Sequence, residues 1–196
     1  MVKLNGDQDF SHLLPCLPAS IVVDILSYHN FIDRQRAFTS AILKYYTLPL
    51  ILNISPDEIV ICQNMFGKPY LPDFPEVDFN ISHSGEYVIL AVAIGHNVGV
   101  DIELIDSNVS LSDIANAVFT EKERQQIKTR NDFYLLWSKK EAYLKCIGDG
   151  FQNNLFETTS FDTTIFQQFS KFSSYAVIWE NYSLALCFSN EVDEFV

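Results

Sequence analysis

The chain has 196 residues, of which 48% are hydrophobic and 19% charged, and its formal net charge is −12 at pH 7. This length suits one domain or two small lobes, and the negative charge argues against binding to nucleic acid or to an anionic membrane. No apolar stretch could span a bilayer, no export signal opens the chain, and the four cysteines are too scattered for disulfides or a zinc site, so we expect a cytoplasmic protein.

The first half of the chain alternates a helix with short strands. Apolar residues at helical spacing predict a helix over 33–46, which Pro49 should end. A short strand over 59–62 is followed by a proline-rich loop over 66–75. Strands are expected over 78–81 and 87–93, around a turn at 82–85, and over 98–104. The segment 87–93 is apolar throughout, which predicts burial on both faces.

The second half begins with helices over 110–118 and 121–128, where Thr120 is a suitable N-cap. The strongest helix pattern covers 132–147 and ends at Gly148, and strands follow over 175–179 and 182–188. Segment 86–91 resembles segment 181–186, which favours two similar lobes. We therefore expect an α+β protein with an N-terminal lobe of residues 1–104 and a C-terminal lobe of residues 105–196.

Two pairs of charged residues could carry chemistry. Asp101 and Glu103 alternate along a strand, so both side chains point to one face, where a hard cation such as Mg²⁺ would relieve their repulsion. Glu141 and Lys145 lie one helical turn apart, where the carboxylate could bind a metal or accept a proton and the ammonium could bind phosphate. A solvated edge strand and a surface ion pair would explain the same residues without any function.

The segment Phe79-Asn80-Ile81-Ser82-His83-Ser84-Gly85 is the third candidate. A histidine between two serines in a turn supplies several hydrogen-bonding groups in a small space. A turn without a functional role would need the glycine but would not need His83.

The order of four motifs along the chain is more specific than any one of them. Gly67-Lys68-Pro69, residues 79–85, Val98-Gly99-Val100-Asp101-Ile102-Glu103 and Trp137-x-x-Lys140-Glu141-Ala142-x-x-Lys145 follow one another. This order resembles the 4′-phosphopantetheinyl transferase superfamily, in particular its larger, surfactin-synthetase-activating (Sfp-type) class. The resemblance covers residues 33–151.

The resemblance implies a fold of two pseudo-symmetric α/β lobes and a monomer. It also implies transfer of the 4′-phosphopantetheine group from coenzyme A to a serine of an apo acyl or peptidyl carrier protein, with release of 3′,5′-ADP. Mg²⁺, or Mn²⁺ in its place, would be bound by Asp101, Glu103 and Glu141. Glu141 would also be the base, and Lys145 would stabilise the leaving group.

The remaining site residues implied by the resemblance would bind coenzyme A. His83, with Ser82 and Ser84, would bind phosphate oxygens, in the segment that also holds Asn80. Gly67, Lys68, Pro69 and Tyr70 would border the adenine and the 3′-phosphate. Arg36, or alternatively Arg34, would add a basic contact from the first helix.

The sequence also departs from the family pattern. Residues 21–32 contain none of the lysines or arginines that often precede the first helix, and Asp149 stands where a cation commonly follows the catalytic helix. A coenzyme A-binding relative without transferase activity, or a plain interaction domain, are the alternatives. Neither requires the carboxylate at position 141. The carrier protein and its pathway are not specified by the sequence.

Overall fold

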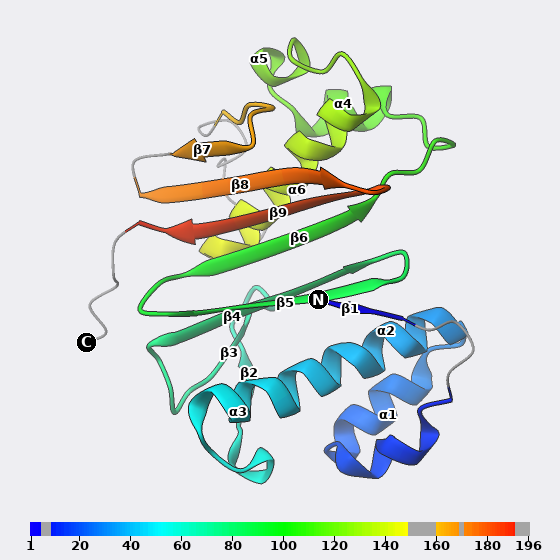
Figure 1. Cartoon of the computed structure of the whole chain (residues 1–196), viewed down its shortest axis with the longest axis vertical. Coiled ribbons are helices and arrows are strands. Elements are labelled where there is room, and N and C mark those ends of the chain that lie inside the picture. The colour runs from blue at the N-terminus through cyan, green and yellow to red at the C-terminus, as the bar shows by residue number, and fades with distance from the viewer. Residues whose placement is uncertain (5–8, 149–159, 169–170, 191–196) are drawn as a thin grey trace.

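The computed structural model describes residues 1–4, 9–148, 160–168 and 171–190. Figure 1 shows two antiparallel sheets one above the other, with α1 (Ala19–Ser27) and α2 (Phe31–Ile42) beside the lower sheet. The expected mixture of helices and antiparallel strands is confirmed. None of the helices in the described ranges is long and apolar enough to cross a membrane.

The lower sheet has the strand order β1-β5-β4. It contains β1 (Val2–Lys3), β4 (Val77–Ser84) and β5 (Tyr87–Ile94), while β2 (Cys62–Gln63) and β3 (Pro69–Tyr70) form a separate pair. The apolar side chains of β4 pack against Leu48, Ile59 and Leu71, which forms the core on this side of the molecule.

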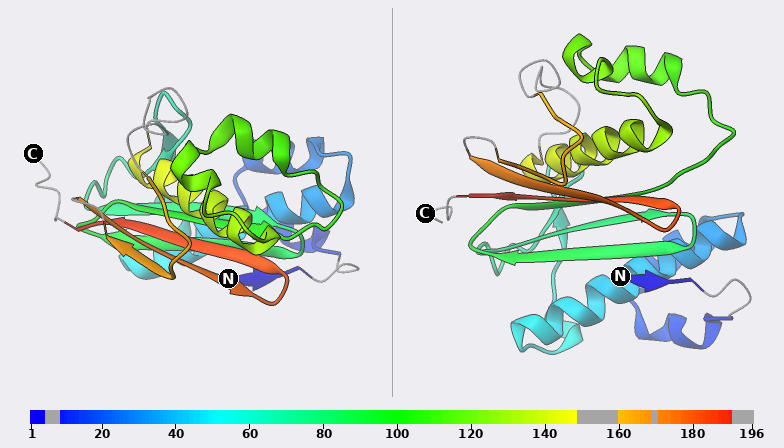
Figure 2. Two further views of the ribbon diagram at one scale, coloured as in Figure 1. Left: turned by 90° about the horizontal axis from the view of Figure 1, so that it is seen from above. Right: turned by 45° about the horizontal axis from the view of Figure 1, so that its top comes forward.

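The upper sheet has the order β6-β9-β8-β7. It contains β6 (Val98–Leu104), β7 (Phe166–Gln168), β8 (Phe172–Trp179) and β9 (Tyr182–Ser189), and α6 (Arg130–Ile147) lies across one of its faces (Figure 2). The short helices α4 (Ser112–Val118) and α5 (Glu121–Arg124) form the far end of the molecule. Thr120 is the N-cap of α5 and Gly148, at φ 78°, ends α6, as the sequence predicted.

Several predicted boundaries are wrong. The helix predicted over 121–128 ends at Arg124, and of the strand predicted over 59–62 only Cys62 belongs to β2. Pro49 does not end the first long helix, because a π-helical turn over Leu43–Thr47 leads into α3 (Leu48–Leu52) and places the proline in its first turn. Proline is tolerated there, since the first helical N–H groups have no partner within the helix. The predicted turn at 82–85 is also wrong. β4 continues to Ser84, which pairs with Tyr87, so the turn contains only Gly85 and Glu86.

The expectation that β5 is buried on both faces is wrong as well. Only Tyr87 and Val88 are buried, and Ile94 is 64% exposed. The face that carries Ile89 and Ala91 lines an apolar cavity of about 640 Å³ that β6, β8 and β9 also line. A strand can therefore be apolar throughout and still be only partly covered.

The two sheets meet along β4 and β6, which run parallel without pairing through their backbones. Instead, side chains of β4 accept hydrogen bonds from backbone N–H groups of β6. The pairs are Asp78 with Val98 (2.7 Å), Asn80 with Val100 (3.0 Å), Ser82 with Ile102 (3.4 Å) and Ser84 with Leu104 (2.9 Å). These contacts provide acceptors for the backbone N–H groups at the edge of the upper sheet, and they fix the register of β6 against β4.

Each sheet contains a long hairpin, β4–β5 below and β8–β9 above. The similar segments 86–91 and 181–186 belong to these two hairpins, and the rings of Tyr87 and Tyr182 contact each other edge to face, 5.0 Å apart. The predicted boundary after residue 104 places β6 in the first lobe, although β6 pairs with β9 of the upper sheet. The boundary remains a prediction, because β6 contacts both lobes along its whole length.

Candidate functional site

The residues with the clearest chemistry line one cavity of about 510 Å³, a size typical of small-molecule sites. Three helices supply its walls, each with residues spaced three or four apart, and β4 and β6 supply polar residues from the seam between the sheets. The polar lining residues include Asp24 of α1, Tyr28 directly after it, Ser40 of α2, Lys44, Ser82 and His83 of β4, Asp101 and Glu103 of β6, and Trp137, Glu141 and Lys145 of α6.

Asp101, Glu103 and Glu141, the three predicted metal ligands, all line this cavity. Lys145 Nζ lies 2.6 Å from Asp101 Oδ1 and 3.1 Å from Ser82 Oγ, so it holds one oxygen of the buried Asp101 carboxylate. Oδ2 of Asp101 is buried and has no hydrogen-bond partner among the described residues. Such an oxygen is available to a ligand, because an unsatisfied buried carboxylate oxygen is costly.

Glu103 is oriented by two hydrogen bonds. The indole Nε1–H of Trp137 donates to Oε1 at 2.9 Å, and the Ser84 hydroxyl lies 3.4 Å from Oε2. Trp137 therefore links the helix motif to the strand motif directly, a contact that the sequence analysis did not foresee.

The acidic groups perturb one another. Burial, together with the charges of Asp101 and Glu103, raises the pKa of Glu141 to about 7. Burial and the Asp101 charge also raise the pKa of Glu103. Both shifts show that negative charge is crowded in a partly desolvated place, which a bound cation would relieve.

These residues fit a hard metal ion by their chemistry, since carboxylate oxygens are the ligands that Mg²⁺ prefers. Among the described residues, however, no set of three or more His, Cys, Asp or Glu side chains is already arranged as a ligand shell. The ammonium of Lys145 lies next to Asp101 instead. The three carboxylates share a cavity, and the assignment of a metal to them remains a prediction.

His83 lines the same cavity, whereas Arg36 acts on His83 through its charge and is not one of the lining residues. His83 is an exposed residue, yet partial desolvation and the neighbouring charge of Arg36 lower its pKa, which favours the neutral imidazole. The guanidinium of Arg36 donates to the carbonyl oxygen of Gly85 at 2.7 and 3.0 Å and pairs with Asp33, which fixes the β4–β5 turn. Arg34 instead donates to the carbonyl oxygen of Tyr28.

The hydroxyl and amide side chains of β4 already form hydrogen bonds where β4 meets β6. Ser82, Ser84 and Asn80 accept hydrogen bonds from β6, and both serines also lie beside a carboxylate. In this structure they position Asp101 and Glu103, and their predicted contact with phosphate remains untested.

The Gly67-Lys68-Pro69-Tyr70 segment lies elsewhere. Lys68 and Tyr70 line a separate cavity of about 340 Å³. Lys68 Nζ is paired with Asp78 at 2.6 Å and donates to the carbonyl oxygen of Cys146 at 2.9 Å, near the end of α6. The structure therefore does not bring this segment into the cavity of the acidic residues, and its predicted contact with the adenine and the 3′-phosphate remains a prediction. Asp149 lies outside the described residues.

The sequence analysis missed the contribution of the helices to the cavity. Helix α1 was not predicted, although Ile21, Ile25 and Tyr28 have helical spacing, because the run of β-branched residues around them masks the pattern. Lys44 was not singled out either. It lies in the π-helical turn and faces the cavity, and turns of this kind occur frequently at functional sites.

The known proteins that this chain resembles are 4′-phosphopantetheinyl transferases. Residues 97–189 match the 4′-phosphopantetheinyl transferase superfamily, and residues 5–95 match a family described as 4′-phosphopantetheinyl transferase, N-terminal. The chain is 32% identical over 162 residues to the 4′-phosphopantetheinyl transferase HetI of Nostoc sp., which covers 76% of this chain and 68% of the relative. The chain therefore belongs to the 4′-phosphopantetheinyl transferase superfamily.

Other relatives match a smaller part. The 4′-phosphopantetheinyl transferase gsp of Aneurinibacillus migulanus is 40% identical over 129 residues, which are 63% of this chain and 52% of the relative. The 4′-phosphopantetheinyl transferase Sfp of Bacillus subtilis is 33% identical over 129 residues, with 63% and 56% covered. The chain thus spans about half the length of several relatives that it matches.

Proposed function

We propose that this chain transfers the 4′-phosphopantetheine group of coenzyme A to a serine of an apo acyl or peptidyl carrier protein, with release of 3′,5′-ADP. The observation that carries the proposal is the group of Asp101, Glu103, Glu141 and Lys145 in one cavity. A protein that only bound coenzyme A would gain nothing from a carboxylate whose pKa is about 7.

In the proposed reaction the serine hydroxyl oxygen attacks the phosphorus that carries the pantetheine arm. A new bond forms between the serine oxygen and phosphorus, and the bond from phosphorus to the ADP oxygen breaks. Glu141, which lines the cavity together with Asp101 and Glu103, accepts the hydroxyl proton directly or through a water molecule. Lys145, whose side chain lines the same cavity, would stabilise the charge that develops on the leaving 3′,5′-ADP.

A divalent cation, Mg²⁺ or Mn²⁺, belongs to the proposal and would be held by Asp101, Glu103 and Glu141. When bound, it would neutralise pyrophosphate charge. Trp137 and Ser84 keep Glu103 turned toward the cavity, and Ser82 with Lys145 does the same for Asp101. Activity as a monomer in the cytoplasm is also part of the proposal.

The test is intact-mass spectrometry of several apo carrier proteins after incubation with the protein, coenzyme A and Mg²⁺. A gain of one phosphopantetheine that is absent with EDTA and with Glu141→Ala is the expected result. Glu76→Ala is the matched control, because Glu76 is exposed on the surface. No gain on any carrier, together with normal coenzyme A binding by calorimetry, would favour a binding protein and contradict the transferase.

A further inference from the structure

Lys44 is a cation that lines the cavity without a partner. Its ammonium makes no ion pair or hydrogen bond with any residue that the structure describes, and burial alone lowers its pKa. No neighbouring carboxylate contributes to that shift, although the chain carries twelve net negative charges. A desolvated ammonium without a counter-charge is unfavourable, so binding of an anion next to Lys44 would be stabilising.

The other lysines that are at least partly buried in the described ranges differ from Lys44 in this respect. Each of them contacts a carboxylate. The pairs are Lys68 with Asp78 at 2.6 Å, Lys139 with Asp162 at 3.3 Å, Lys140 with Glu123 at 2.7 Å, and Lys145 with Asp101 at 2.6 Å. Lys68, which the resemblance places near the 3′-phosphate, is thus already neutralised by Asp78, whereas Lys44 has its charge available.

Ser40 provides a second, independent observation. It lies one helical turn before Lys44 and lines the same cavity, and its Oγ is buried without a hydrogen-bond partner among the described residues. An ammonium beside a free hydroxyl donor is a combination that suits a phosphate group, which accepts several hydrogen bonds and carries negative charge.

Coenzyme A carries two separate anionic groups, the pyrophosphate and the 3′-phosphate monoester. The proposed function, on which this inference rests, places the pyrophosphate at Lys145 and the carboxylates. Lys44 lies in the π-helical turn that follows α2, on another wall of the cavity. We propose that Lys44, with Ser40, binds the 3′-phosphate of coenzyme A. This residue then supplies the positive charge that residues 21–32 lack.

Calorimetric titration with coenzyme A and with dephospho-coenzyme A, which lacks only the 3′-phosphate, tests this assignment. Lys44→Met should weaken coenzyme A binding about tenfold or more, as expected for loss of a charge-assisted contact. The same variant should bind dephospho-coenzyme A within about twofold of the unchanged protein, because the ligand no longer presents the group that Lys44 contacts. Lys44→Arg, which keeps the charge, should retain most of the affinity.

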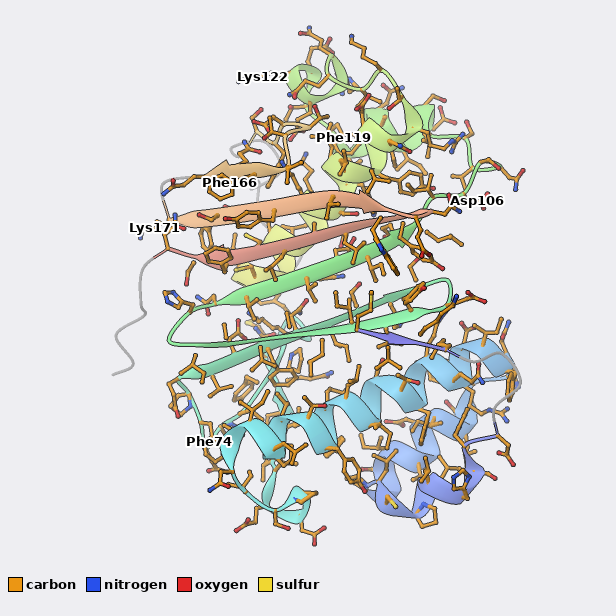
Figure 3. All side chains as sticks on the ribbon, in the orientation of Figure 1. Phe74, Asp106, Phe119, Lys122, Phe166 and Lys171 are labelled. Carbon is orange, nitrogen blue, oxygen red and sulfur yellow. The ribbon has the colours of Figure 1, made fainter. Side chains whose placement is uncertain are left out.

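Lys122→Met is the matched control. Lys122 is exposed on α5 at the far end of the molecule (Figure 3), so its replacement changes the net charge equally without touching the cavity. Equal losses for the two ligands, or no loss for either, would overturn the assignment and leave the transferase proposal intact. Failure of the unchanged protein to bind coenzyme A at all would overturn both.

Discussion

Glu141→Gln should make the metal-free protein more stable while it abolishes transfer. The side chain keeps its shape in this variant but can no longer ionise. In the folded protein the pKa of Glu141 is about 7, against an ordinary value of 4.5, because of burial and of the charges of Asp101 and Glu103. The site is therefore strained electrostatically whenever all three carboxylates are ionised and no cation is present.

The magnitude follows from the linkage between proton binding and folding. A carboxyl group whose folded pKa is raised binds protons more tightly in the folded state, so stability falls as the pH rises from 4.5 to 7. Full ionisation above pH 7 corresponds to about 3 kcal/mol of lost stability at most. Because the cavity is open to water, we expect Glu141→Gln to recover about 1–3 kcal/mol at pH 8 and less than about 1 kcal/mol at pH 5.

Urea unfolding in EDTA at pH 5 and at pH 8 measures this difference. In a thermal scan at pH 8 the gain corresponds to a rise in Tm of about 2–10 °C. Glu76→Gln, at an exposed position, is the matched control for net charge and should change stability by less than about 0.5 kcal/mol. A gain that is the same at both pH values, or a loss of stability at pH 8, would refute the assigned repulsion.

Gly99→Ala should destabilise the protein by about 3 kcal/mol or more, or prevent folding, because a Cβ atom there would overlap the backbone of α6. Urea unfolding measures the change in stability, and an unchanged stability would contradict the close packing of β6 on α6. Asn80→Ala should lower the free energy of unfolding by about 1–3 kcal/mol in the same assay, because the buried N–H of Val100 loses its acceptor. A loss below about 0.5 kcal/mol would contradict the importance of this hydrogen bond between β4 and β6. Trp137→Phe should slow carrier modification about tenfold with little loss of stability, because Glu103 loses an orienting hydrogen bond; unchanged transfer by mass spectrometry would argue against that role.

Local patterns were sufficient to predict the central elements and the identity of the acidic residues. Helix α6 has a continuous apolar pattern and a terminal glycine, and β6 has a regular alternation that places Asp101 and Glu103 on one face. These features depend on residues close together in sequence, which is why periodicity and spacing can predict them.

Other features depended on contacts between distant segments, and only the tertiary structure decided them. Three features required knowledge of which elements pack together. They are the continuation of the helix through Pro49, the ion pair of Lys68 with Asp78, and the side-chain hydrogen bonds between β4 and β6. The same holds for the free charge of Lys44. Sequence alone determines that a lysine stands at this position. Its burial, and its lack of a counter-charge among the residues that the structure describes, arise from the packing of α1, α2 and α6 around one cavity.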